Sequence, residues 1–311
     1  CLIRNYVLGI DAFIMLSTLH KTKLKFMRKI ILFFFVLSSC FTFAQQKQSL
    51  AFCPQIFSYG LKDSLRIGVS NIRIRYAFQP QDLANVDTWI DCGQLLYNDS
   101  LSQYSSYFLT QHVKALKKWK LENPNKGYYP NSINLRGRRR GYWSEYQFSQ
   151  IITCNNKLTE WAVMPLVEPQ QWMYTEAYPS MSWSLSTDTT TICGYLCQKA
   201  TCRWRGRNYV AWFAPQLPIK LGPWKFGGLP GLIMKIYDTK HLYTWQAVAI
   251  DKGEFPILQL GKKYFKETTR NKVRKMQYEY NVKYAELSGR MRGPQGIPVT
   301  TRYPYDQLEL E

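Results

Sequence analysis

Alternating hydrophobic and polar positions predict that much of the chain beyond residue 70 forms antiparallel strands. The clearest example is residues 71–79, in which Ile72, Ile74 and Tyr76 alternate with polar or small residues. This two-residue period is typical of a strand with one face on a core and one in water. Apolar segments on either side of short polar turns predict three hairpins. They are residues 143–153 with 158–164, 190–204 with 208–213, and 232–237 with 243–250.

Two segments carry the spacing of an amphipathic helix. Over residues 100–122 apolar side chains recur every three or four positions, and Pro124 supplies a stop. Residues 268–284 fit both a strand and a helix, and their Lys, Arg, Gln, Met and Glu content favours the helix. The sequence therefore predicts a mainly β (α+β) protein, a curved antiparallel meander sheet with one or two packed helices. An open half-barrel is one form that such a sheet can take.

The first 44 residues have the pattern of an export segment. Arg28 and Lys29 precede the apolar residues 30–37, and small residues precede Gln45, as in a secretory signal peptide. We expect cleavage after Ala44, and lipidation of Cys40 is the alternative. The protein would then lie in the periplasm, associate with the outer membrane or be secreted. The expected order is an upstream translated segment over 1–26, the signal peptide over 27–44, one β-rich domain over 45–290 and a tail over 291–311.

The charge is strongly basic, with 41 Lys and Arg against 21 Asp and Glu and a formal net charge of +20. Basic surfaces attract nucleic acid, anionic lipid head groups or acidic glycans, and an exported protein meets the last two more often. We therefore expect a lipid or an anionic glycan as a partner, no nucleic acid, and a monomer. A solvated surface is the alternative. The basic segment Arg136 to Arg140 could bind phosphate groups through bidentate contacts, and a solvated loop is the alternative.

Six cysteines remain beyond the export segment, and an oxidising compartment would permit disulfides. If Cys193 and Cys197 share one extended strand, four residues separate them by about 13 Å, whereas bridged Cα atoms lie within about 7 Å. Bridges would then join Cys193, Cys197 and Cys202, which lie close together in the sequence, to the widely spaced Cys53, Cys92 and Cys154. Free thiols are the alternative. The spacing is not that of a zinc site, so we expect no metal and no cofactor. The six are Cys53, Cys92, Cys154, Cys193, Cys197 and Cys202.

Residues 189–238 resemble the GLPGLI family of exported proteins from Gram-negative bacteria, which is named after the six residues that stand here as Gly228 to Ile233. Weaker likeness covers most of the mature chain, and Cys193 and Cys202 depart from the family pattern. The resemblance implies no established activity and no catalytic residues. The family motif, which we expect to be structural, comprises Gly194, Tyr195, Cys197, Arg205, Gly206, Arg207, Trp212, Pro218, Gly222, Pro223, Gly228, Leu229, Pro230, Gly231, Leu232 and Ile233.

The glycine cluster of this motif predicts a corner between two strands. Residues 229–232 fit a type II turn, in which Pro230 fixes φ and Gly231 supplies the positive φ of the third position. Leu229 and Leu232 would then enter the core beside Trp224. The alternative is that bare backbone amides hold an anionic or peptide group. No Lys-Ser or Lys-Thr follows, which excludes a nucleotide P-loop.

Aromatic side chains gather on adjoining predicted strands. Such strands suit either a solid core or a sheet bent round an apolar cavity, and a solid core is the preferred interpretation. The residues are Trp204, Tyr209, Trp212, Phe213, Trp224, Tyr237 and Trp245.

Catalytic motifs are scarce. Beyond residue 44 the histidines are His112 and His241, which cannot make a three-histidine zinc site, and neither begins H-E-x-x-H. No G-x-S-x-G elbow is present. The acids that could form a glycosidase-like pair include Glu145, Glu160, Glu168, Glu176 and Asp188.

These observations favour an exported, non-catalytic cell-envelope protein that binds a lipidic or glycan ligand in an aromatic-lined concavity between sheet and helix. One alternative is a secreted hydrolase with a carboxylate pair. A second alternative is a structural partner of an outer-membrane transporter or secretion system.

Overall fold

The structure is a computed structural model that describes residues 64–127, 149–163, 171–283 and 307–311. The chain divides into two compact units, Cys1–Lys47 and Gln48–Glu311, and every described residue belongs to the second. The expected signal peptide, Cys53, the basic segment Arg136 to Arg140, Glu145 and Glu168 lie outside the described residues.

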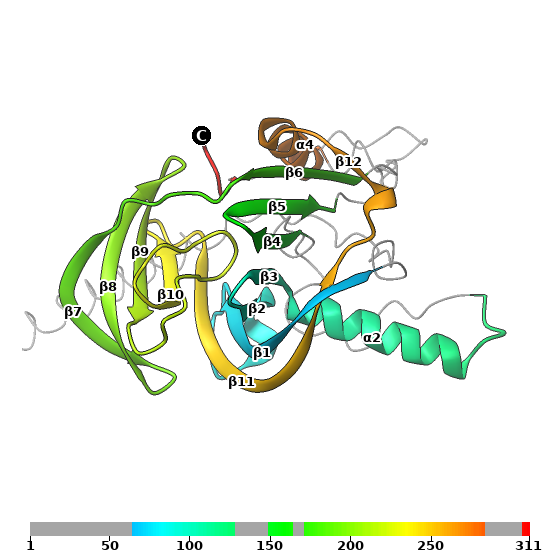
Figure 1. Ribbon diagram of the computed structural model, residues 1–311, viewed down its shortest axis with the longest axis horizontal. Coiled ribbons are helices and arrows are strands. Elements are labelled where there is room, and N and C mark those ends of the chain that lie inside the picture. Colours follow the sequence, from blue (N-terminus) through cyan, green and yellow to red (C-terminus); the bar gives the residue numbers. More distant parts are fainter. Residues whose placement is uncertain (1–63, 128–148, 164–170, 284–306) are drawn as a thin grey trace, which may run out of the picture. The chain divides into compact units, whose positions relative to one another are not determined.

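The described residues form one open, curved sheet of twelve strands, which confirms the predicted fold class (Figure 1). Its order is β12-β6-β5-β4-β3-β2-β1-β11-β10-β9-β8-β7. Neighbours pair antiparallel except β12 and β6, which are parallel. The strands are β1 (Leu65–Phe78), β2 (Asp91–Asn98), β3 (Leu101–Ser106), β4 (Gln150–Cys154), β5 (Lys157–Ala162), β6 (Gln171–Ala177), β7 (Ser184–Ile192), β8 (Tyr195–Trp204), β9 (Arg207–Ala214), β10 (Leu232–Asp238), β11 (Thr244–Gln259) and β12 (Phe265–Glu267).

The three predicted hairpins are present as β4–β5, β8–β9 and β10–β11. Asn155 and Asn156 make the first turn with φ values of 49° and 57°, the positive values that a two-residue hairpin turn needs. The single strand predicted over residues 190–204 is wrong. Cys193 and Gly194 have φ values of 51° and 80° and turn the chain between β7 and β8, so this stretch contains a fourth hairpin.

Within the described ranges two α-helices accompany the sheet, α2 (Tyr107–Glu122) and α4 (Arg270–Val282), with short 3-10 turns η1 (Val86–Thr88) and η3 (Lys262–Tyr264). Helix α4 confirms the helical interpretation of residues 268–284. The helix predicted from residue 100 is wrong over its first turns, because Leu101–Ser106 is strand β3 between β2 and β4. The Ser106 side chain accepts a hydrogen bond from the Leu109 amide and starts α2 there.

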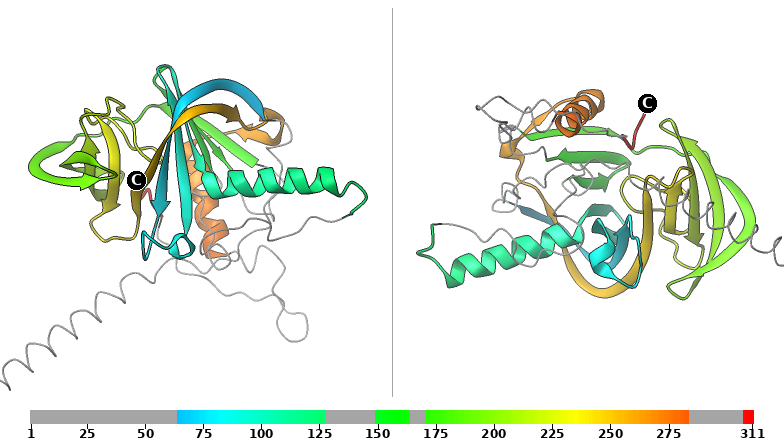
Figure 2. Two further views of the ribbon diagram at one scale, coloured as in Figure 1. Left: turned by 90° about the horizontal axis from the view of Figure 1, so that it is seen from below. Right: turned by 180° about the vertical axis from the view of Figure 1, so that it is seen from behind.

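The two helices make different contacts. Helix α4 packs on β6 through a small cluster in which Val273 meets Tyr174. Helix α2 buries its first turns and then leads away from the sheet, as Figure 2 shows. Near its far end Leu121 is 83% exposed. Only the beginning of α2 can therefore contribute to a site against the sheet.

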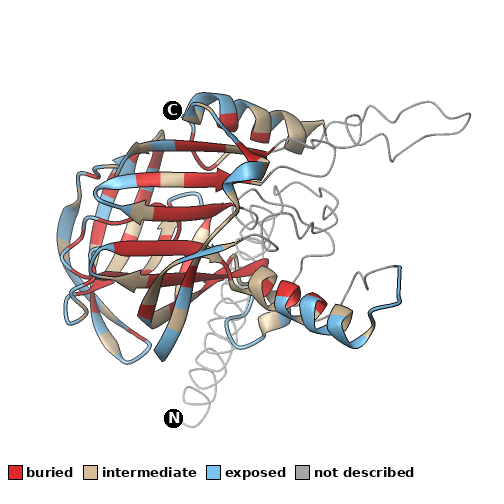
Figure 3. Ribbon diagram, turned by 45° about the vertical axis from the view of Figure 1, so that its right-hand side comes forward, coloured by how far each residue is buried: buried red, intermediate tan, exposed pale blue. Residues whose placement is uncertain are grey.

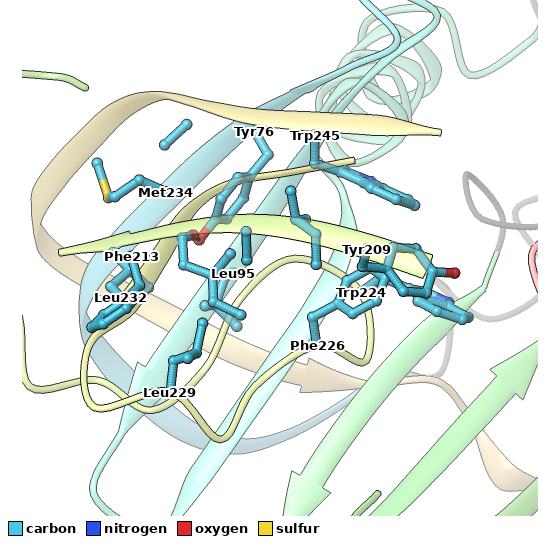
Figure 4. Close-up of a cluster of buried hydrophobic side chains, with 14 of the residues drawn as sticks. Tyr76, Leu95, Tyr209, Phe213, Trp224, Phe226, Leu229, Leu232, Met234 and Trp245 are labelled. Atoms are coloured by element: carbon cyan, nitrogen blue, oxygen red, sulfur yellow. Dashed lines mark hydrogen bonds between the residues drawn. The ribbon is translucent and has the colours of Figure 1, made fainter. Parts of the chain in front are cut away.

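The main core lies on the inner face of the curved sheet (Figure 3). The loop between β9 and β10 covers this face, and its Trp224 and Phe226 pack against Tyr209 and Trp245 (Figure 4). The ring centroids are 4.8 Å apart for Tyr209 and Phe226 and 5.7 Å apart for Phe226 and Trp245. The preferred solid core is therefore the arrangement found, and the aromatic-lined concavity that we expected to hold a ligand is filled by the protein's own side chains.

Two of the seven predicted core aromatics are only half-buried. Trp212 and Tyr237 alternate with core residues on β9 and β10, which puts them on the opposite side of the sheet. The Lys199 ammonium lies 5.9 Å from the ring centre of Trp212, and His241 stacks on Tyr237 at 4.6 Å.

The end of β11 crosses the inner side of β3 and β4. The Gln103 Oε1 accepts a hydrogen bond from the Leu258 amide at 3.0 Å, and the Gln150 Oε1 accepts one from the Leu260 amide at 3.0 Å. The chain then continues into β12, which pairs with β6 at the far edge of the sheet. This crossing frames a pocket beside the start of α2.

Candidate ligand-binding site

A pocket of about 120 Å³ lies between the first turns of α2, strands β1 to β3 and the end of β11. Most of the polar side chains that line it are amides and hydroxyls, while Leu96, Leu109 and Phe255 supply apolar surface. Concave sites of this kind hold small ligands by apolar contact and orient them through a few polar groups. The amide and hydroxyl groups include Gln94, Gln103, Gln111, Gln150, Ser105 and Thr110.

Part of the polar lining is already engaged with the protein. The Gln94 amide donates to Ser105 at 3.3 Å and to Thr110 at 3.2 Å. Gln150 also donates to the Leu258 carbonyl at 2.7 Å. These bonds fix the orientation of the walls before any ligand arrives, which lowers the entropic cost of binding.

Arg73 is held rigidly at one wall. Its guanidinium lies 5.0 Å from the ring centre of Tyr107 and 4.4 Å from that of Phe255. Its Nε donates to Asp251 at 2.9 Å. Within the described chain the two terminal amino groups of Arg73 make no hydrogen bond, so they remain available as donors.

Positive charge outweighs negative charge around the pocket. Arg73 and the exposed Lys114 line it, and no acidic residue does so among the described residues. Asp251 stands behind Arg73 and is shared with Arg75. Burial would raise the pKa of Asp251, but hydrogen bonds from Arg75 and Arg73 outweigh it and lower the pKa, which keeps the carboxylate ionised.

The loop between β9 and β10, residues 215–231, is called the motif loop here, and it contributes Lys225 to a different feature, a buried cluster of charges. The Lys225 ammonium lies 2.7 Å from Oε2 of Glu160, 2.6 Å from Oε1 of Glu309 and 2.7 Å from the Tyr174 hydroxyl. The Tyr174 hydroxyl donates to Glu160 at 2.7 Å. The cavity beside these groups measures only about 20 Å³, enough for about a single water molecule.

Residues 307–311 complete this cluster. We expected them to belong to a tail, and that expectation is wrong here, because Leu308 lies in the main core and Glu309 is 5% exposed. The Glu309 carboxylate also forms ion pairs with Arg205 at 2.5 Å and with Arg270 at 2.6 Å. The segment therefore ties the β8–β9 turn and the motif loop to helix α4.

The cluster explains how the two ends of the sheet meet. Strand β6 is second in the sheet and β8 is eleventh, yet Arg205, which follows β8, lies 2.8 Å from Glu176 on β6. Lys225 likewise reaches Tyr174 on β6. The sheet curls until its ends are bridged by side chains while its edge strands stay unpaired with each other.

Gly231 of the motif and the neighbouring Gly227 are packed against protein atoms. A Cβ on Gly231 would collide with the Ala214 carbonyl, and one on Gly227 would collide with the Tyr178 hydroxyl. The predicted positive φ at Gly231 is wrong, since the positive value lies at Gly228, with φ of 86°. Glycine is needed at position 231 because the Ala214 backbone leaves no space for a Cβ atom there. Leu229, like Leu232 and Trp224, is buried in the core as the corner interpretation requires.

Other motif residues also serve contacts within the protein. Arg207 lies 3.6 Å from Asp238 and donates to the Leu308 carbonyl at 2.9 Å. A Cβ on Gly222 would approach Ile233 to 2.8 Å. Gly206 and Gly194 occupy hairpin turns with positive φ.

The described cysteines are all free, which overturns the expected bridges among them. Cys193 lies in a turn rather than on the strand of Cys197, so the spacing argument does not apply to this pair. His112 is buried on α2 and His241 lies in the β10–β11 turn. Among the described residues no three His, Cys, Asp or Glu side chains gather as metal ligands. No helix in the described ranges is long and apolar enough to cross a membrane.

The sequence pattern does not identify the residues that matter most here. In the sequence Arg73 and Lys114 have the pattern of solvent-facing basic residues. They line a pocket only because β1, α2 and β11 lie together in the fold. Lys225 carries a weak signal, a single lysine between Trp224 and Phe226 in an apolar segment. Glu309 carries none.

Comparisons with known proteins place the recognisable part of the chain at the motif. A family model described as "Protein of unknown function (Porph_ging)" matches residues 204–235. No curated protein matches the chain. Two solved structures, "Structure of PNGF-II in P21 space group" and "Structure of PNGF-II in C2 space group", are 14% identical over 67% of this chain, with TM-scores of 0.42 and 0.41. The chain spans 33% and 32% of their lengths, about a third.

Proposed function

We propose that the protein is an exported, non-catalytic cell-envelope protein of the GLPGLI family that binds a glycan in the pocket between α2 and the sheet. The observation that carries the proposal is the pocket of about 120 Å³ with its amide and hydroxyl lining. Sugars present many hydroxyl groups that both donate and accept, and side-chain amides and hydroxyls match them in both roles. Phe255 and Leu109 add apolar surface for the ring carbons.

The lining favours a glycan over a lipid tail. An acyl chain gains affinity from apolar area, whereas burying unpaired amides such as Gln111 beside it would be costly. The aromatic cluster that could have received a lipid is filled by Trp224, Phe226 and Trp245.

Binding without hydrolysis is favoured by the position of the acids. A glycosidase needs two carboxyl groups on either side of the scissile bond, about 5 to 9.5 Å apart with the sugar between them. Glu160 and Glu309 instead contact the same lysine beside a cavity of about 20 Å³. The cavity has no room for a sugar ring between them.

The proposal is tested by glycan-array screening and calorimetry with the purified full-length protein. We expect micromolar to millimolar binding of a glycan that Leu109→Trp abolishes, because the indole would fill the pocket. The matched control is Leu121→Trp, which places the same ring on the exposed end of the same helix. Equal binding by wild type and Leu109→Trp, or binding of lipid vesicles without any glycan, would overturn the proposal.

A further inference from the structure

Arg73 and Arg75 both form ion pairs with Asp251, which lies behind the pocket. Arg75 donates to both oxygens of Asp251, through Nε at 2.9 Å and Nη2 at 3.1 Å. Arg73 adds only its Nε to the same carboxylate. Arg75 alone therefore neutralises the charge of Asp251 and donates to both of its oxygens. The positive charge of Arg73 is left without a negative charge of its own.

The surroundings of Arg73 fix its guanidinium while leaving one edge free. The side chain is 19% exposed and its plane is held by the Tyr107 and Phe255 rings. The unused terminal amino groups belong to a residue that lines the pocket. A guanidinium presents its donors as a rigid fork that matches the two oxygens of a carboxylate, and a preorganised fork loses little entropy on binding.

Lys114 supplies a second cation from helix α2. It follows Thr110 by one helical turn and Gln111 by three residues, so the three side chains lie on one face of α2 above the pocket. Its ammonium makes no hydrogen bond or ion pair within the described chain, and the residue is exposed. A flexible lysine acts as a point charge and strengthens binding of an anion without fixing its geometry.

We infer that the glycan of this pocket is acidic, and that Arg73 binds its carboxylate as a bidentate partner while Lys114 adds charge from the α2 rim. This inference rests on the proposed function, because it assigns the chemical class of the ligand to the same pocket. The neutral amides would contact the sugar hydroxyls.

The test compares uronic-acid oligosaccharides with the same oligosaccharides after their carboxylates have been reduced to alcohols. Calorimetry with the full-length protein should show the acidic form binding about tenfold or more tightly than its reduced counterpart, as a charge-assisted hydrogen-bond pair requires. Arg73→Gln should remove that preference, so that the acidic and reduced forms bind with similar affinity. Lys114→Gln should weaken the acidic form less, with a smaller dependence on salt.

Matched controls separate recognition from folding. Arg66→Gln removes an exposed arginine of the same strand and should leave both affinities unchanged. Arg73→Gln should unfold close to the wild-type temperature, because Arg75 still pairs with Asp251.

The outcomes are distinct. Equal affinity for the acidic and reduced forms would overturn the acidic ligand while the proposed glycan binding stands. Failure of both forms, or binding of anionic lipid vesicles in their place, would overturn the glycan itself. Loss of the preference in Arg66→Gln as well would show that net charge, and not the Arg73 fork, carries the selectivity, and would overturn the assignment to Arg73.

Discussion

The Lys225 ammonium lies 2.6 Å from the Glu309 carboxylate, although 84 positions separate the two residues along the chain. The Lys225 and Glu309 side chains are 3% and 5% exposed. Charges this deeply buried stay ionised only when partners replace the water that they lose. The contact therefore makes the motif loop and residues 307–311 dependent on each other.

Glu309→Gln should destabilise the protein by about 3 kcal/mol, because it leaves Lys225, Arg205 and Arg270 with one carboxylate too few in a buried place. The control is Glu311→Gln, which loses a pair that is more than half exposed with Arg203 and should change stability by less than about 1 kcal/mol. Urea unfolding measures both. Equal effects would show that the buried cluster contributes no more than a surface ion pair.

Stability should fall as the solution is acidified, and Glu309 should account for part of the fall. Burial would raise the pKa of Glu309, but Lys225 and Arg205 outweigh it and lower the pKa from 4.5 to about 2. The stabilisation is then complete above about pH 4.5 and is lost as the pH falls toward 2, for a total of about 3 kcal/mol. The difference in unfolding free energy between wild type and Glu309→Gln should shrink across that window. A difference independent of pH would contradict the assignment.

Gly231→Ala should destabilise the fold by about 3 kcal/mol, because the new methyl group meets the Ala214 backbone, which cannot move aside as a side chain can. Gly127→Ala is the matched control, since a Cβ there has no atom within 4 Å. Thermal unfolding should separate the two variants clearly. If Gly231→Ala melts with the wild type, the close contact does not explain this glycine of the motif.

Alkylation of the native protein should modify Cys154 and Cys193 and spare the buried thiols. Burial raises the pKa of Cys197 to about 11 and that of Cys202 to about 12, so few thiolates form at neutral pH. Peptide mass spectrometry after iodoacetamide treatment, with and without urea, measures the pattern. Modification of Cys197 without urea, or a bridge between any two of these four cysteines, would contradict the structure.

Local chemistry made the hairpins and α4 predictable. Asn155, Asn156 and Gly206 are turn residues of types that tolerate positive φ, and the apolar runs around them have strand periodicity. The start of α2 was not predictable in the same way. Leu101 and Tyr104 have the spacing of a helix face, but both sides of β3 are buried, so the alternation of a strand is missing.

The candidate site could not be read from the sequence, because long-range pairing creates it. Arg73 faces the pocket through the pairing of β1 with β11, and Phe255 reaches it only because β11 bends over β3. The same limit applies to Glu309, whose partners come from the β8–β9 turn, the β9–β10 loop and α4. Periodicity reports which face of an element is buried, and it carries no information on which distant element covers that face.

The position of Glu309 in the chain has a consequence for biosynthesis. It follows every strand and both α-helices of the described residues, so the ribosome must finish all of these elements before side chains can bridge the two ends of the sheet. Before Glu309 is in place, Lys225 lacks one of its two carboxylate partners, and the side chains around Glu160 are open to water. A nascent chain that stalls before residue 307 should therefore present a loosened, protease-sensitive sheet.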